Sequence, residues 1–336
     1  MGKRLHDWFL AAWYGDTARG WWLLPLAWLF GGLAGFRRAL YSRGWLRRYR
    51  SRRPVIVVGN LTVGGTGKTP FTVWLARELL RRGFSVGVAL RGYGGERGPA
   101  RLVSASDSAA TVGDEACLLR RKLGVPVAIA ARRADAVRLL EDACDAILCD
   151  DGLQHYALAR DIEIAVVDGA RGLGNGWLLP AGPLREPVKR LASVDAVVIN
   201  GDGFDWPSAI RMRIEPLAVV ALRDGSRRPL ADYAGREVTA IAAIGNPERF
   251  FGQLRAHGLR IETRVLPDHA RFTPQEAGAD AGRSLLMTEK DAVKCTGDGW
   301  GDAGYLEVEA RVDGDAASGL LERIAALASK SKGMTP

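Results

Sequence analysis

The chain has 336 residues, 47% of them hydrophobic and 25% charged, a composition that allows two globular domains and excludes a disordered or collagen-like chain. Its four cysteines form no C-x-x-C pair, so they predict neither a zinc site nor a disulfide framework and favour a reducing compartment. The net charge of +9 lies wholly in residues 1–53, where eleven lysines and arginines face two acids, and the rest of the chain is neutral.

The same 53 residues contain an uncharged run and most of the tryptophans. The run GWWLLPLAWLFGGLAGF, residues 20–36, is followed by eight arginines between Arg37 and Arg53. A bilayer span needs about 20 apolar residues, so this run is a borderline span at best. Because most of the charge follows the run, a secretory signal is excluded. Six of the ten tryptophans lie in this segment: Trp8, Trp13, Trp21, Trp22, Trp28 and Trp45.

Apolar residues after Pro25 recur at helical spacing, and proline suits the first turn of a helix. Tryptophan favours the lipid interface, and each arginine attracts anionic headgroups by roughly 1 kcal/mol. We therefore expect residues 1–53 to form a helical membrane foot, monotopic or with a single short anchor, whose arginines lie on the cytoplasmic side. The alternative is an apolar helix packed on the body of the protein. Nucleic acid is a weaker candidate partner, because the basic run adjoins an apolar helix.

After Arg53, short apolar runs alternate with helical patterns. The runs suited to buried parallel strands are residues 55–58, 85–90, 126–130, 146–149, 162–167 and 196–200. Helical patterns at 71–82 and 115–123 lie between them, which predicts a doubly wound parallel α/β domain over residues 54–205. Residues 206–235 are expected to form linker strands. The alternation then resumes as a second, smaller α/β domain over residues 236–330, with strands at 238–244, 260–266, 284–287 and 305–308 and a helix at 247–257.

The stretch VIVVGNLTVGGTGKTP, residues 55–70, is typical of a strand that enters a phosphate-binding loop, so the first domain is expected to be P-loop NTPase-like. The usual G-x-x-x-x-G-K-[ST] pattern has glycine where this chain has Thr62. Such a loop tolerates another residue there if the backbone needs no positive φ. Lys68 is expected to reach the β and γ phosphates, and Thr69 to ligate Mg²⁺. The expected ATP loop comprises Thr62, Val63, Gly64, Gly65, Thr66, Gly67, Lys68 and Thr69.

The stretch DAILCDDGLQH places Asp150 and Asp151 directly after an apolar run. P-loop proteins hold Mg²⁺ or its water with an acid at the end of a neighbouring strand. The pair could also be a plain turn, because Asp-Gly is a turn dipeptide. Beside a P-loop, the metal role is favoured.

Asp114 and His269 are two further candidates, and a catalytic part for His269 requires the second domain to fold over the first. Asp114, in TVGDEACLLRRKL, is expected to cap a helix, although a carboxylate facing the γ-phosphate would also accept the proton of an attacking hydroxyl. His269, in LPDHARFT, follows a predicted strand and taken alone is expected to be a surface or turn histidine.

Three arginines lie on glycine-rich loops: Arg91 in LRGYGG, and Arg171 and Arg185 in DGARGLGNGWLLPAGPLREP. An arginine on a shaped loop suits a bidentate grip on a phosphate. Solvated loop arginines are equally expected from composition alone.

Taken in order, these motifs resemble the tetraacyldisaccharide 4'-kinase family of lipid A biosynthesis: GNLTVGGTGKTP, RGYGG, VGDEA, CDDGLQH, the loop at 168–187, IGNPERFF, PDHARF and LMTEKDAVK. The resemblance spans residues 54–294. It implies a membrane-associated P-loop kinase that transfers the γ-phosphate of ATP to the 4'-hydroxyl of a tetraacyl glucosamine disaccharide 1-phosphate, forming lipid IVA.

The resemblance also implies roles for single residues. Asp114 matches the family's catalytic carboxylate, which would take the hydroxyl proton, and His269 matches the histidine paired with it. Asp150 and Asp151 match the acidic pair at the metal, and Lys68 the lysine of the loop. The candidates for holding the 1-phosphate or other headgroup oxygens are Arg91, Arg171 and Arg185.

The implied cofactors are ATP and Mg²⁺. The implied partners are the acylated disaccharide phosphate lipid and the cytoplasmic leaflet of the inner membrane, with no nucleic acid and no obligate protein partner. The alternative is a membrane-associated P-loop ATPase that acts as a switch or assembly factor. Those proteins carry a signature lysine at the position of Val63, so its absence counts against them. No N-K-x-D guanine motif is present, which makes a GTPase weaker still.

Overall fold

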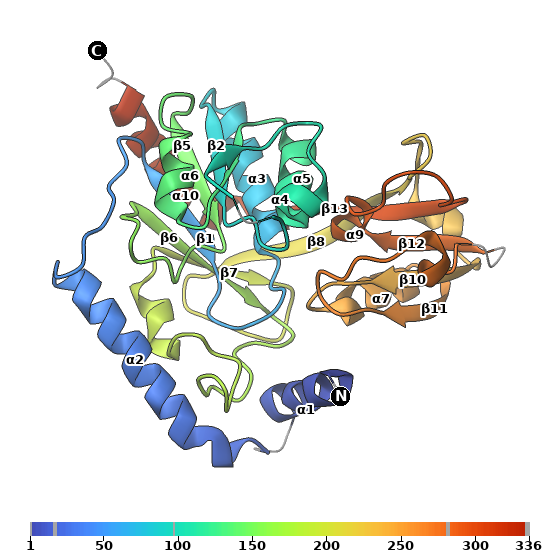
Figure 1. Ribbon diagram of the computed structural model, residues 1–336, viewed down its shortest axis with the longest axis horizontal. Helices are drawn as coiled ribbons and strands as arrows, with labels where there is room; N and C mark the ends of the chain where they lie inside the picture. The colour runs from blue at the N-terminus through green and yellow to red at the C-terminus, as the bar shows by residue number, and fades with distance from the viewer. Residues whose placement is uncertain (1, 16–18, 97, 280–282, 333–336) are drawn as a thin grey trace.

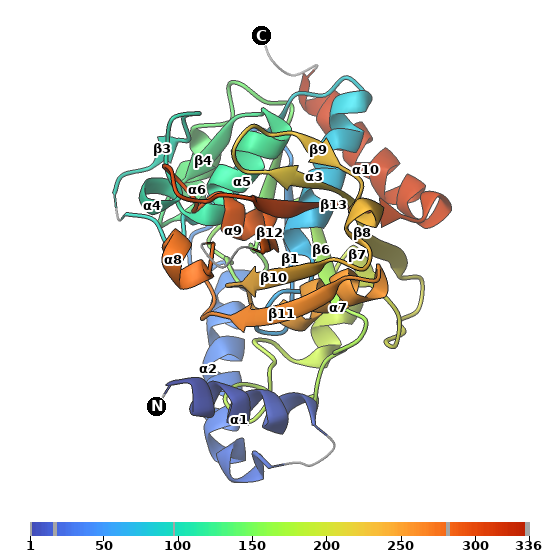
Figure 2. The ribbon, with the colours of Figure 1, turned by 90° about the vertical axis from the view of Figure 1, so that its right-hand side faces the viewer.

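One mixed sheet of thirteen strands runs through the protein. The structure is a computed structural model that describes residues 2–15, 19–96, 98–279 and 283–332. Twelve strands follow one another in the order β11-β10-β12-β13-β8-β7-β6-β1-β5-β2-β4-β3, and β9 pairs with β8 beside this path (Figure 1; β3, β4 and β9 are labelled in Figure 2). The antiparallel pairs are β3 with β4, β8 with β13, and β8 with β9.

The first half of the sheet centres on β1 (Val55–Gly59), which runs parallel between β5 and β6. Its residues are buried on both faces, as a continuous apolar run predicts. The other strands of this half are β2 (Val86–Leu90), β3 (Arg101–Leu102), β4 (Val127–Ile129), β5 (Ala146–Asp150), β6 (Ile162–Asp168) and β7 (Ala196–Asn200).

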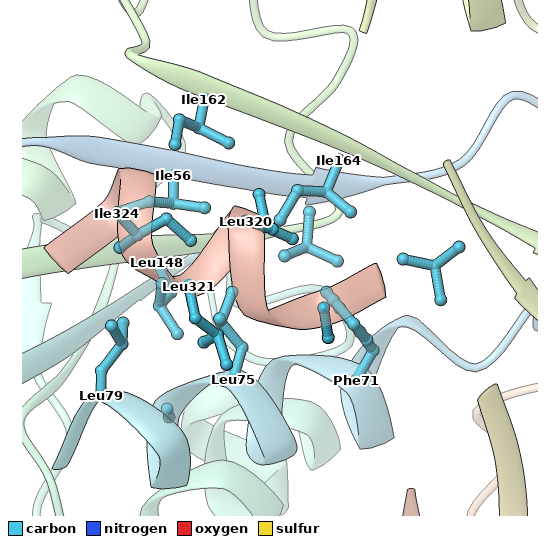
Figure 3. Close-up of a cluster of buried hydrophobic side chains, with 14 of the residues drawn as sticks. Ile56, Phe71, Leu75, Leu79, Leu148, Ile162, Ile164, Leu320, Leu321 and Ile324 are labelled. Carbon is cyan, nitrogen blue, oxygen red and sulfur yellow. The ribbon is translucent and has the colours of Figure 1, made fainter. Parts of the chain in front are cut away.

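Helices α3 (Lys68–Arg81) and α10 (Gly314–Lys332) cover one face of this half. Figure 3 shows how their side chains meet those of the strands in one apolar cluster. The remaining helices of this half are α4 (Ala109–Val112), α5 (Asp114–Leu123), α6 (Arg133–Arg138) and the 3-10 helix η2 (Val188–Ser193). The last helix of the chain therefore returns to the P-loop half.

The second half is joined to the first by β8 (Ile210–Ala221), which pairs with β7 at residues 210–212 and with β13 along its length (Figure 1). Its strands are β9 (Arg227–Arg228), β10 (Glu237–Ala242), β11 (Arg260–Val265), β12 (Ser284–Thr288) and β13 (Ala303–Val312). Its helices are η3 (Leu230–Tyr233), α7 (Pro247–Ala256), α8 (Pro274–Ala277) and α9 (Glu289–Ala292).

The foot consists of α1 (Gly2–Tyr14), the short η1 (Trp21–Leu23) and α2 (Leu24–Ser42), on the side of the molecule away from α10 (Figure 1, Figure 2). Leu23 and Ala27 pack with Ala181 of the long loop at 168–187. The outward side of α2 is apolar and exposed: Trp28, Leu29 and Phe36 are 69%, 60% and 63% exposed. Among helices within the described ranges, none combines the length and apolarity needed to cross a bilayer.

The doubly wound α/β fold with a smaller second α/β unit is confirmed, and all six strands predicted for the first half are present. The helix predicted from Phe71 begins three residues earlier, at Lys68, because Gly67 with φ 97° ends the loop there. The domain division at residues 53, 205 and 235 stays a prediction. Helix α10 packs on the first half, whereas the predicted division assigns residues 236–330, and with them most of α10, to the second domain.

Candidate active site

The phosphate-binding loop connects β1 to α3 through two glycines with positive φ, Gly64 at 101° and Gly67 at 97°. A Cβ at Gly67 would lie 2.3 Å from Nδ2 of Asn200, so only glycine fits there. Thr62 is not among the residues with positive φ, which explains why the position of the missing glycine accepts threonine. It forms a bridge with Leu184, and the N–H of Val63 donates to the carbonyl of Pro183 at 2.9 Å. Thr62 and Val63 therefore anchor the loop rather than line the cavity beside it.

A cavity of about 300 Å³ separates this loop from the second half of the protein. Residues 64–70 form one wall. The opposite wall comes from the turn before α7 (Ile244, Gly245 and Asn246), from α7 itself, and from α9 with Lys290. We call it the nucleotide cavity, because the glycine-rich loop and the N-terminus of α3 face it.

Oxygen donors gather at the carboxyl end of β5, beside the loop. The Thr69 hydroxyl donates to Oδ2 of Asp150 at 3.0 Å, and Nζ of Lys68 lies 3.4 Å from Oδ1 of Asp151. Burial, together with Glu115 and Asp151, raises the pKa of Asp150 to about 7. Burial also raises the pKa of Asp151, but Lys68 and Arg185 outweigh it and hold that pKa well below its usual range.

These donors fit a divalent cation shared with phosphates. Mg²⁺ prefers hard oxygen ligands. The buried carboxylate of Asp150 and the neighbouring Thr69 hydroxyl are such ligands, and the raised pKa of Asp150 shows that too little positive charge surrounds it. Within the described residues, no group of three or more His, Cys, Asp or Glu side chains could hold a metal by itself. The site therefore fits a cation that is completed by a nucleotide better than one held by protein alone.

Arg133 supports the acidic pair from behind. It is 4% exposed, and its Nη2 donates to the carbonyls of Asp150 at 2.6 Å and Asp151 at 3.3 Å. Asp151 has a positive φ of 52°, so these hydrogen bonds hold a turn that non-glycine residues rarely adopt. The other two guanidinium nitrogens of Arg133 have no hydrogen-bond partner among the described residues.

Asp114 and His269 meet across the two halves. Nδ1 of His269 lies 2.9 and 3.0 Å from the two carboxylate oxygens of Asp114. Asp114 is the first residue of α5, and its Oδ1 also accepts from the N–H of Glu115 at 2.9 Å. His269 has a positive φ of 63°, and its ring meets that of Tyr93 edge-on at 4.8 Å. Asp114 and His269 are therefore close enough to act together chemically.

Asp114 and His269 differ in how far they are exposed, and two lysines lie close to them. Asp114 is 4% exposed and lies behind the histidine, whereas His269 lines the nucleotide cavity. Burial raises the pKa of Asp114, but the hydrogen bond with His269 and the charges of Lys290 and Lys294 lower it below its ordinary value. Lys294 lies 3.8 Å from Oδ2 of Asp114, and Lys290 lies 4.0 Å from it. Asp114 is therefore held as a carboxylate.

A second cavity of about 920 Å³ lies between α2 and the carboxyl edge of the first half. It is apolar where α2 contributes Phe30 and Leu33, and polar at its inner end. The wall opposite α2 has several cationic or hydrogen-bonding side chains: Arg91, Arg133, Gln154, His155, Tyr156 and Arg185. Helix α2 itself adds Arg37. We call it the acceptor cavity. It shares His269, Asp268, Asp151, Glu115 and Arg185 with the nucleotide cavity.

The three loop arginines separate into two groups. Arg91 and Arg185 line the acceptor cavity. Arg171 does not: its guanidinium lies 5.3 Å from the ring centroid of Tyr14 in α1, and its Nη2 donates to Oδ1 of Asn246 at 3.0 Å. Arg171 thus ties the foot to the second half of the protein.

Several residues of the site were missed by sequence reasoning. Lys290 and Lys294 lie in the quoted LMTEKDAVK motif without an assigned role; Lys290 is in α9, and Lys294 follows the end of that helix. Gln154 and His155 follow the acidic pair after two intervening residues. Burial, with Arg133 and Arg91, lowers the pKa of His155 to about 4, so it is neutral. Arg133 is preceded by another arginine and carried no signal.

The chain is similar to known proteins over nearly its whole length. The model of the family described as tetraacyldisaccharide-1-P 4'-kinase matches residues 19–325. A tetraacyldisaccharide 4'-kinase from Aeromonas hydrophila is 48% identical over 329 residues, which cover 96% of this chain and 97% of that protein. One from Pseudomonas aeruginosa is 48% identical over 306 residues, covering 90% and 92%.

Among solved structures, that of LpxK from Aquifex aeolicus in complex with ATP is similar with a TM-score of 0.76 at 30% identity. The similarity covers 91% of this chain and 98% of that one. A shared fold, an ATP-binding relative and family similarity along the whole chain agree with the geometry of the site. The chain therefore belongs to the tetraacyldisaccharide 4'-kinase family of phosphotransferases.

Proposed function

We propose that this protein transfers the γ-phosphate of ATP to the 4'-hydroxyl of a tetraacyl glucosamine disaccharide 1-phosphate, forming lipid IVA. The observation that carries the proposal is the position of His269, which lines both the nucleotide cavity and the acceptor cavity. A group at that meeting point touches the attacking hydroxyl when both cavities are filled. Family membership names the acceptor.

The geometry favours His269 as the general base and Asp114 as the group that orients it, the reverse of the roles expected from the sequence. The Nδ1 side of the imidazole faces the buried carboxylate of Asp114. The Nε2 side is left to accept the hydroxyl proton, and Asp114 stabilises the imidazolium that forms. Lys68 and the loop N–H groups of residues 64–69 stabilise charge on the β and γ phosphates.

Thr69, Asp150 and Asp151 would hold Mg²⁺ together with the nucleotide, for the reasons of donor chemistry given above. When bound, the cation would neutralise charge on the phosphate oxygens. Because Asp114 and His269 belong to different halves, closure between them completes the site and excludes water.

The acceptor cavity suits a lipid with an anionic headgroup. Its outer part is walled by the apolar side of α2 and its inner part by arginines. Arg133 is a strong candidate for a phosphate or sugar oxygen, because two of its buried nitrogens have no partner in the described part of the chain. Arg91 and Arg185 are the other candidates, and Arg171 is not one.

The foot supports a location on the cytoplasmic face of the inner membrane. The exposed apolar side of α2, followed by eight arginines, suits an interfacial helix that lies on an anionic leaflet. A lipid acceptor with four acyl chains stays in the bilayer, so the protein must approach it there.

The test supplies γ-labelled ATP, Mg²⁺ and the disaccharide lipid in detergent micelles. We expect label in the lipid with wild type and with Lys330→Ala, which changes an exposed lysine of α10. We expect none above background with Lys68→Ala or Asp114→Ala. A folded wild type that leaves the lipid unlabelled would refute the proposal. ATP hydrolysis stimulated by a protein or by DNA, but not by lipid, would favour a switch ATPase.

A further inference from the structure

The Nζ atom of Lys290 contacts the imidazole of His269, although the two residues are 21 positions apart in the sequence. Its Nζ is 3.3 Å from Nε2 of His269, 3.2 Å from Oε1 of Glu115 and 3.8 Å from Oδ1 of Asp268. The side chain is 20% exposed and lines the nucleotide cavity. It therefore reaches the imidazole atom that the proposed mechanism uses as a base.

The ammonium group of Lys290 has donors only. Burial lowers the pKa of Lys290, but Glu115, Asp114 and Asp268 raise it above its ordinary value, so the group is charged at neutral pH. An ammonium group carries three N–H donors and no acceptor, so Nε2 of His269 faces a donor. A contact at 3.3 Å is a hydrogen bond only if Nε2 offers its lone pair. If Nε2 carried a proton, its N–H and an N–H of Lys290 would face each other, and neither group could accept a hydrogen bond.

The other ring nitrogen has the opposite partner. Nδ1 faces the carboxylate of Asp114, which accepts only. The proton of a neutral ring therefore belongs on Nδ1. The remaining groups beside the ring are Asp268, which is half-exposed and lies 3.7 Å from Nε2, and the Tyr93 ring, in an edge-to-face contact. Lys294 and Glu115 act on the ring through Asp114 and Lys290.

We propose that Lys290 is a positioning residue that holds His269 in the neutral form with its proton on Nδ1 and its lone pair on Nε2. The inference rests on the proposed function, because it matters only if Nε2 takes the hydroxyl proton. Asp114 and Lys290 select the same form from opposite sides of the ring. Either residue alone would select this ring form less strongly. A carboxylate alone, for example, also stabilises the doubly protonated ring.

The ammonium group must leave Nε2 when the acceptor hydroxyl arrives. Lys290 lines the same cavity as the P-loop, so the oxygens of the transferred phosphoryl group are within its reach as an alternative partner. In the empty site, Lys290 thus disfavours protonation of Nε2 of His269. When ATP is present, Lys290 binds the phosphate oxygens instead and leaves Nε2 free to accept the hydroxyl proton. In that state it adds positive charge where the transition state accumulates negative charge.

Two variants separate charge from bulk. Lys290→Met keeps the length and removes the cation, and Lys290→Arg keeps a donor-only cation. Removing a cation near the ring favours its protonation. In Lys290→Met, we therefore expect the acidic limb of the pH profile of kcat/KM to move to higher pH by about one unit or more. We also expect at least a tenfold loss of rate at pH 7. Lys290→Arg should leave the limb within about half a unit of wild type.

The second readout is independent of catalysis. ¹⁵N NMR of ring-labelled histidine in the ligand-free full chain, assigned with His269→Asn, should show a pyrrole-type Nδ1 and a pyridine-type Nε2 in wild type and Lys290→Arg. Lys290→Met should show a mixture of forms or a charged ring at the same pH. Wild type with its proton on Nε2 overturns the inference, even if the Met variant does not fold.

An unmoved acidic limb in a folded Lys290→Met enzyme also overturns the inference. If wild type shows the expected ring form but transfers no phosphate to the lipid, the proposed function fails while the ring assignment stands.

Discussion

Replacing Asp114 with asparagine should reverse the hydrogen-bonding of His269, the proposed base, while keeping the shape of the site. Oδ1 of Asp114 accepts from the N–H of Glu115 at 2.9 Å, so the amide oxygen of the variant takes that place. The amide nitrogen then takes the place of Oδ2, 2.9 Å from Nδ1 of His269. An N–H facing Nδ1 turns that atom into an acceptor and moves the ring proton to Nε2. The lone pair no longer faces the acceptor.

The size of the loss follows from comparable carboxylate–histidine pairs, in which the wrong ring form costs about 10⁴-fold in kcat. This corresponds to about 5.5 kcal/mol of transition-state stabilisation at 1.36 kcal/mol per decade. The loss of the charge near Lys290 and Lys294 acts in the same direction. ATP should bind as before, because Asp114 is buried behind His269.

The assay measures initial rates of label transfer to the lipid in micelles, with ATP affinity by calorimetry and the melting temperature as checks. Asp145→Asn is the matched control. It removes another buried carboxylate, which accepts from Ser85 at the opposite, amino edge of the strands. We expect it to retain the wild-type rate. An Asp114→Asn rate within tenfold of wild type would refute the reasoning, as would a double Asp114→Asn/His269→Asn variant much slower than either single one.

Three further outcomes are expected. Arg133→Met should raise KM for the lipid by about 10- to 100-fold, since a charge-assisted hydrogen bond is worth about 1.5–3 kcal/mol. Arg132→Met, at a neighbouring exposed arginine, should not; equal effects of the two would contradict the assignment. Leu29→Glu with Phe36→Glu should lower partition onto anionic vesicles at least tenfold without changing the melting temperature, because both side chains are exposed. Leu102→Glu, at an exposed leucine of β3 outside the foot, is its control. The folded pKa of Asp114 lies below its unfolded value of about 3.9, so its stabilisation is present above that pH and is lost as pH falls through the folded pKa. The urea midpoint should therefore fall less steeply below about pH 4 in Asp114→Asn than in wild type.

The local parts of the fold could be predicted because local physics determines them. The apolar run at 55–58 requires a strand buried on both faces, and the glycines before Lys68 require a loop with positive φ. The position of α10 could not be predicted in this way. Its apolar side fits any apolar face of suitable width, and only the complete sheet shows that the face between α3 and β1 is open for it.

The candidate site divides in the same way. Lys68 and Thr69 follow β1, and the acidic pair ends β5, the parallel strand beside it. Their proximity therefore follows once the two apolar runs are placed as neighbouring parallel strands. The contact of Asp114 with His269 joins residues 155 positions apart, and nothing in either local stretch requires it. Arg171 illustrates the same limit for a loop residue. A loop arginine fits a phosphate as well as it fits the Tyr14 ring, and only the packing of α1 decides between them.

Helix α2 has two sides with different surroundings. Its outward side presents Trp28 and Leu29 to the exterior, and its inward side provides Phe30 and Ala34 to the acceptor cavity. If the outward side lies in lipid, one wall of the reaction chamber is continuous with the bilayer. An acyl chain then moves sideways along the helix and never crosses water. The search for substrate becomes two-dimensional, and the rate should follow the mole fraction of acceptor in the membrane. Adding inert lipid at constant bulk concentrations should slow the enzyme by dilution alone.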